Sequence, residues 1–84
     1  MRHATPETLE LIEPLLKKLR RLPQLRERSN GVFYFRSKAF LHFHEDSGDI
    51  FADVRLNPPE FDRLRVSTRA EQDGLVRLVE EHLN

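Results

Sequence analysis

Two β-prone runs, Ala39–Glu45 and Ile50–Leu56, flank the tetrad Asp46-Ser47-Gly48-Asp49. Side chains in both runs alternate with a period of two, which is typical of strands that bury one face. The tetrad has the composition of a tight turn. This segment therefore predicts an antiparallel hairpin, and no other feature of the chain constrains the fold as strongly.

The pairing across this hairpin separates two faces. If Ser47 and Gly48 are the two turn residues, His42 lies opposite Asp53 and His44 lies opposite Phe51. The predicted core face carries Leu41, Phe43, Ile50, Ala52, Val54 and Leu56. The other face, called the open face below, carries Phe40, His42, His44, Phe51, Asp53 and Arg55.

Further strands are predicted on both sides of the hairpin. Leu25–Arg28 reads as a short strand, and Ser29-Asn30-Gly31 suits a turn into the aromatic run Val32–Arg36. Phe61–Val66 alternates again and reads as either an edge strand or an extended loop. The sheet is therefore expected to be an antiparallel meander of three to five strands.

The turn near Ser37 leaves one register open. A three-residue turn at Arg36-Ser37-Lys38 would place Phe33 and Phe35 in the core and Tyr34 on the open face. A two-residue turn would reverse these three side chains, and the sequence does not decide between the two.

Helix signals precede and follow the strands. Thr5 and Pro6 are typical of the start of a helix, Pro14 predicts a kink or division near Glu13, and Pro23 ends the helical pattern. A hydroxyl and a carboxylate three residues apart, at Thr68 and Glu71, predict a capping box before a C-terminal helix. The expected fold is a two-layer α+β domain with both helices on one sheet face.

Composition excludes several classes of protein. The chain has 84 residues, the size of a single domain spanning 1–84, and 14 basic residues balance 14 acidic ones. A zero net charge is unusual for a dedicated nucleic-acid or membrane-surface binder. The sequence has no cysteine, and its N-terminal composition and short apolar runs lead us to expect neither a secretory segment nor a transmembrane stretch. The expected location is the cytoplasm.

Aromatic side chains on the open face predict self-association. Phe40, Phe51 and, in one register, Tyr34 would form an exposed apolar patch, which usually marks an interface or a ligand groove. A homodimer that buries this patch is the favoured interpretation. The alternatives are another protein partner, a small ligand or peptide on the same surface, and cover by the segment Asn57–Leu64.

A metal or small-ligand site is the main alternative function. His42 and His44 stand two apart on one strand with Asp53 opposite, and imidazole and carboxylate ligands suit Zn²⁺ or Ni²⁺. Residues two apart on a strand are ~7 Å apart, which is wide for a chelate. The structural alternative is a polar strip in which His42 hydrogen-bonds Asp53.

Catalysis and nucleic-acid binding are weaker interpretations. His42 and Asp53 resemble an acid–base pair, but no serine has an evident link to them, so an enzyme is not favoured. Basic residues between positions 17 and 38, together with sheet aromatics, have the composition of a platform for single-stranded nucleic acid. The acidic turn around Asp46 and Asp49 would repel phosphate.

Four runs together resemble the small bacterial "luciferase family" domain of unknown function. They are Leu22–Arg28, Gly31–Phe35, Ala39–Asp46 and Ala52–Leu56. The resemblance covers about positions 9–56 and extends to the C-terminal helix, whereas the stretch Asn57–Ser67 is shorter than in that family. It implies a helix, an antiparallel sheet and a closing helix, and its motif points to His42, His44 and Asp53. The family name does not imply bioluminescence.

The sequence as a whole predicts a non-catalytic interaction module without a cofactor, acting through its open face. The residues expected at that surface are Phe40, His42, His44, Phe51, Asp53, Arg55 and Tyr34. The alternative is a divalent metal such as Zn²⁺, or a small ligand, at His42, His44 and Asp53.

Overall fold

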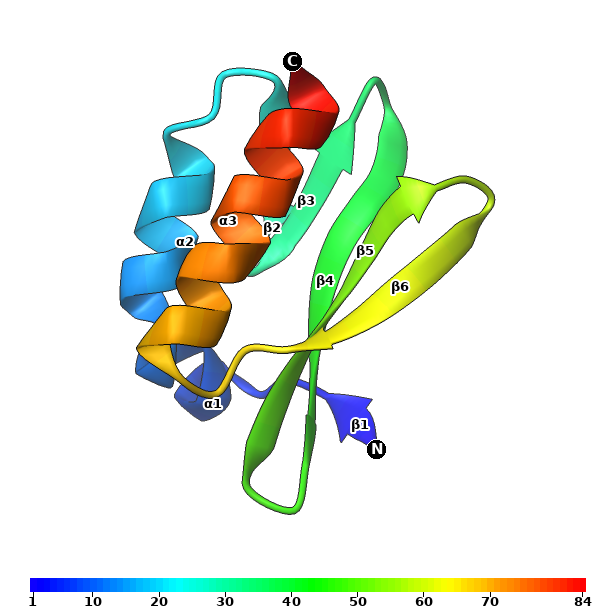
Figure 1. Cartoon of the computed structure of the whole chain (residues 1–84). Helices are drawn as coiled ribbons and strands as arrows, with labels where there is room; N and C mark the ends of the chain where they lie inside the picture. The colour runs from blue at the N-terminus through cyan, green and yellow to red at the C-terminus, as the bar shows by residue number, and fades with distance from the viewer.

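The computed structural model describes all residues from 1 to 84 and contains three helices and a six-stranded antiparallel sheet (Figure 1). The elements in chain order are β1 (Arg2–His3), α1 (Pro6–Leu11), α2 (Glu13–Arg20), β2 (Leu25–Ser29), β3 (Val32–Phe35), β4 (Lys38–Asp46), β5 (Asp49–Asn57), β6 (Glu60–Arg65) and α3 (Arg69–Leu83). The predicted α+β class, with helices near both ends of the chain, is confirmed.

The helix boundaries follow from local chemistry, as predicted. The Thr5 hydroxyl accepts a hydrogen bond from the backbone N–H of Thr8 and caps α1. The N-terminal helix divides at Ile12, two residues before Pro14, because proline has no N–H to donate within a helix. Thr68 and Glu71 form the expected capping box at the start of α3.

The strands pair in the order β2-β3-β4-β5-β6, and β1 pairs separately with β4. The predicted register of the β4–β5 hairpin is confirmed, since His42 lies opposite Asp53 and His44 opposite Phe51. Leu25–Ser29 and Glu60–Arg65 are both strands, which decides the two uncertain segments. The two-residue strand β1 has no counterpart in the sequence prediction.

The turn between β3 and β4 has two residues, Arg36 and Ser37, which have positive φ angles of 52° and 67°. The pairing then shifts by one residue, because Phe33 lies opposite Leu41 while Tyr34 lies opposite Ala39. Phe40 is therefore left without an opposite residue, as in a β-bulge. The bulge cancels the reversal expected from a two-residue turn, so Phe33 is buried in the core.

The same bulge overturns the predicted position of Phe40. Its side chain is 3% exposed and belongs to the hydrophobic core instead of the open face. The Phe40 ring lies 5.7 Å from Phe35 and 5.5 Å from His82 of α3. The prediction was wrong because it assumed strict alternation, which an extra residue in one strand interrupts.

One hydrophobic core joins the helices to the sheet, and Figure 1 shows α2 and α3 side by side. Its fully or nearly fully buried members are Leu9, Ile12, Leu15, Leu16, Leu19, Phe33, Phe40, Leu41, Phe43, Ile50, Ala52, Val54, Val66, Leu75 and Val79. The predicted core face of the β4–β5 hairpin is thus buried, with Leu56 packed at its margin. None of the helices has the length and apolar composition that crossing a membrane requires.

Candidate metal centre

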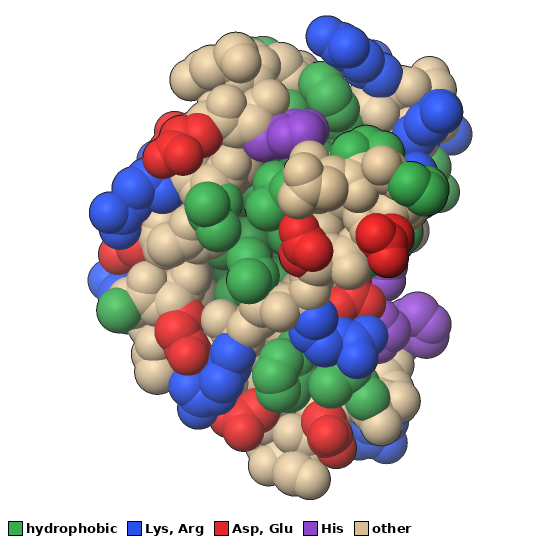
Figure 2. Space-filling model, turned by 45° about the vertical axis from the view of Figure 1, so that its right-hand side comes forward, with side chains coloured by type: hydrophobic (Ala, Val, Ile, Leu, Met, Phe, Trp, Pro, Cys, Tyr) green, Lys and Arg blue, Asp and Glu red, His purple; other side chains and the backbone are tan.

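The structure brings three of the predicted site residues together on the open face. His42 and His44 come from β4, and Asp53 comes from the neighbouring strand β5. Strand alternation places all three side chains on the same side, opposite the buried Phe43 and Ala52. Figure 2 shows histidine side chains gathered at one margin of the molecule, next to acidic and basic groups.

The polar atoms of these residues converge on one carboxylate oxygen. Asp53 Oδ2 lies 3.0 Å from Nε2 of His44 and 3.4 Å from Nε2 of His42. The two imidazole centroids are 5.0 Å apart, closer than the ~7 Å spacing of alternate strand residues. One potential ligand atom from each residue lies within 4.8 Å of the other two.

Arg63 of β6 completes the surroundings of Asp53. Its Nε donates to Oδ1 at 2.8 Å and its Nη2 donates to Oδ2 at 2.9 Å, which makes a bidentate pair. This hydrogen bonding holds the pKa of Asp53 below its ordinary value, and burial opposes the effect. Sequence reasoning missed Arg63, although the alternation of Phe61–Val66 would have placed it beside Asp53 once that run was taken as a strand.

Burial sets the protonation of His42. Removal from water lowers its pKa, and nearby His44, His3 and Arg63 act in the same direction against the attraction of Asp53. A lowered pKa keeps the imidazole neutral at neutral pH. A neutral imidazole offers the lone pair that a metal ion requires.

A third histidine reaches the cluster from the N-terminal strand. His3 lies opposite His44 in the β1–β4 pairing, and their rings stack with centroids 4.6 Å apart. Its ring is 6.2 Å from that of His42. Nothing in the sequence near position 3 indicated a strand, because two residues are too few to show a period.

An aromatic ring borders the cluster on its β6 side. The Phe61 ring meets His42 edge-on at 5.2 Å, and the guanidinium of Arg55 lies 4.5 Å from the centroid of the same ring.

Phe51 is half-buried opposite His44. Tyr34 lies apart, on β3, with Arg28 stacked 4.8 Å from its ring. Of the predicted surface, Phe40 and Tyr34 are thus not part of the histidine cluster.

No protein-family model, curated protein or solved structure matches the chain. The resemblance of positions 9–56 to the luciferase-family domain therefore stays a prediction, and the functional proposal rests on the geometry of the site.

Proposed function

We propose that the chain binds one divalent transition-metal ion through His42, His44 and Asp53. The observation that carries the proposal is the convergence of the two Nε2 atoms on Asp53 Oδ2. Two imidazoles and one carboxylate favour Zn²⁺ or Ni²⁺ over Mg²⁺ or Ca²⁺, which prefer oxygen ligands only. Three protein ligands would leave at least one position of the ion open.

The distances fit such an ion. Zinc–ligand bonds of about 2.0–2.1 Å place neighbouring tetrahedral ligands about 3.3 Å apart. The two nitrogen–oxygen distances, 3.0 and 3.4 Å, are close to that value. The three potential ligand atoms together lie within 4.8 Å of one another, so the side chains would have to rotate to bring every pair to about 3.3 Å.

Arg63 has a role compatible with this site. In the ion-free chain it supplies the positive charge that the buried Asp53 requires. Metal-bound carboxylates are commonly held by a second hydrogen-bonding group, and the bond from Arg63 Nε to Oδ1 leaves Oδ2 for the ion. The Arg63 side chain is 47% exposed, so Nη2 can leave Oδ2 for water.

Direct titration of the metal-free chain with Zn²⁺ tests the proposal. We expect one ion per chain for the wild type and no specific binding for the double variant His42→Ala/His44→Ala. The matched control is His82→Ala, because His82 packs against Phe40 away from the cluster. Equal binding by the double variant and the wild type, or loss of binding in the control alone, would contradict the proposal.

Self-association through the open face stays a prediction. Burial of Phe40 removes one of the three aromatic residues on which it rested. Sedimentation equilibrium with and without EDTA separates the two functions. A monomer that binds zinc supports the metal site alone, a dimer unaffected by EDTA supports the interface, and a dimer that EDTA dissociates indicates an ion shared between two chains.

A further inference from the structure

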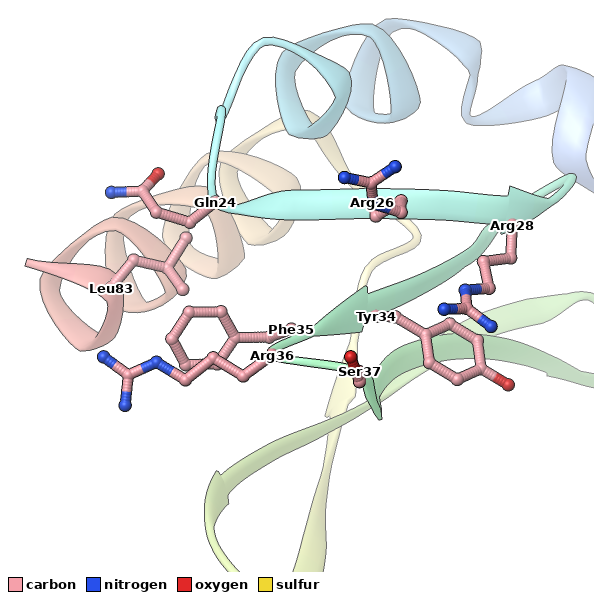
Figure 3. Close-up of a pocket in the computed structure, with 8 residues that line it drawn as sticks. All are labelled: Gln24, Arg26, Arg28, Tyr34, Phe35, Arg36, Ser37 and Leu83. Atoms are coloured by element: carbon pink, nitrogen blue, oxygen red, sulfur yellow. The ribbon is translucent and has the colours of Figure 1, made fainter.

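A second polar surface lies on β2 and β3, away from the histidine cluster. A cavity of about 420 Å³ lies there, in the size range of small-molecule sites, and Figure 3 shows the residues that line it. Three arginines line it: Arg26 and Arg28 come from β2, and Arg36 comes from the turn after β3. Tyr34 and Phe35 also line it, and because they are successive residues of β3 their rings point in opposite directions (Figure 3).

The positive charge of this cavity is not neutralised within the chain. Some basic residues elsewhere form ion pairs, such as Lys18 with Asp73 and Arg63 with Asp53, whereas others, such as Arg69 and Arg77, form none. The three cavity arginines form no such ion pair, and neither Asp nor Glu lines the cavity. The zero net charge of the whole chain therefore conceals a local excess of positive charge.

Each aromatic ring in the cavity has a guanidinium beside it. Arg28 lies 4.8 Å from the centroid of Tyr34, and Arg36 lies 4.9 Å from the centroid of Phe35. Both rings are half-buried, which leaves part of their surface accessible. A ring next to a cation can stack a planar base while the cation binds the adjoining phosphate.

The basic surface continues past Arg36. A second cavity, also about 420 Å³, shares Phe35 and Arg36 with the first and adds Lys38, Arg55 and His82, again without an acidic residue. The Nε atom of Arg55 is buried without a hydrogen-bond partner, so one donor there lacks an acceptor. Two adjoining cavities suit an extended anionic chain better than a single small anion.

We propose that this surface binds single-stranded nucleic acid, with phosphates on the arginines and a base stacked on Tyr34. The bases of a single strand are free to stack on protein rings, whereas those of a duplex are already stacked on one another. The proposal is independent of the metal site. The binding assay is therefore carried out in the presence of EDTA, which keeps metal ions off the histidine cluster.

The test measures fluorescence anisotropy of a labelled 12-nucleotide RNA of mixed sequence at about 50 mM salt. Contacts from three arginines predict a slope of log K against log salt of about −2, or roughly a 20-fold loss of affinity between 50 and 200 mM. We expect Arg26→Gln/Arg28→Gln to weaken binding about tenfold or more and to reduce the slope by about 1.4. The matched control, Arg69→Gln/Arg77→Gln, makes the same charge change on exposed positions of α3 and should leave binding nearly unchanged.

A further variant, Tyr34→Leu, removes the ring and keeps the charge. We expect binding about tenfold weaker with the salt slope unchanged, because stacking does not release counterions. No binding at about 50 mM salt would overturn the proposal, and so would equal losses in the two arginine double variants. Displacement of the RNA by inorganic polyphosphate as readily as by unlabelled RNA would also overturn it, since bases would then contribute nothing. Thermal melts of each variant verify that it is folded.

Discussion

Zinc should raise the melting temperature of the wild-type chain by about 15 °C when free Zn²⁺ is held at about 100 times its dissociation constant. At that excess, an ion that binds only the folded state adds about 2.7 kcal/mol to the free energy of unfolding. A chain of 84 residues has an unfolding entropy of about 176 cal/mol/K, at roughly 2.1 cal/mol/K per residue. Dividing the first quantity by the second gives the shift.

The positions of the three metal ligands explain why the folded chain should bind zinc more tightly than the unfolded chain. His42 and His44 lie on one strand, and Asp53 reaches them only through the β4–β5 pairing. In the unfolded chain no turn holds the carboxylate next to the imidazoles, so the third ligand contributes little. The free energy of binding therefore becomes free energy of folding.

The assay is circular-dichroism melting in a zinc buffer, with each variant compared with and without the ion. His42→Ala/His44→Ala should lose the shift, whereas His82→Ala should keep it, whatever its own stability. A shift of equal size in all three proteins would show that zinc acts somewhere else on the chain. No shift in the wild type at 100-fold excess would refute the reasoning from convergent ligands.

Three further predictions concern stability. Phe40→Ala should lower the free energy of unfolding, measured in urea, by about 3–5 kcal/mol because Phe40 is buried in the core. Phe51 is half-buried, so Phe51→Ala should cost only about 1–2 kcal/mol. Equal losses in the two variants would contradict the burial of Phe40 by the bulge. Burial lowers the pKa of His42 from 6.5, so the unfolded chain takes up a proton first as the pH falls. Stability should therefore decrease below about pH 6.5, and His42→Gln should flatten that decrease in urea titrations. Gly31→Ala should destabilise more than Gly48→Ala, because both have positive φ but only the former would meet a side chain, at 2.9 Å; equal losses in thermal melts would count against this.

The sequence was sufficient to predict those features of the fold that depend on groups close together along the chain. The Thr68 cap depends on a carboxylate three residues away, and the break before Pro14 depends on one missing donor. The register of β4 and β5 depends on the turn at Ser47 and Gly48 and on burial of one alternating face. Because these signals are local, they are also enough to place His42, His44 and Asp53 on one surface.

Tertiary structure decided whatever depends on distant residues or on a broken period. The bulge at Phe40 reconciles a two-residue turn with burial of Phe33 in the core, and local sequence does not show where such an extra residue will fall. His3 joins the cluster because the two-residue strand β1 pairs with β4, which places His3 opposite His44. Arg63 reaches Asp53 because β6 pairs with β5. The three site residues could thus be identified from the sequence. The pairing of Arg63 with Asp53 and the extent of the open face were determined by packing between strands.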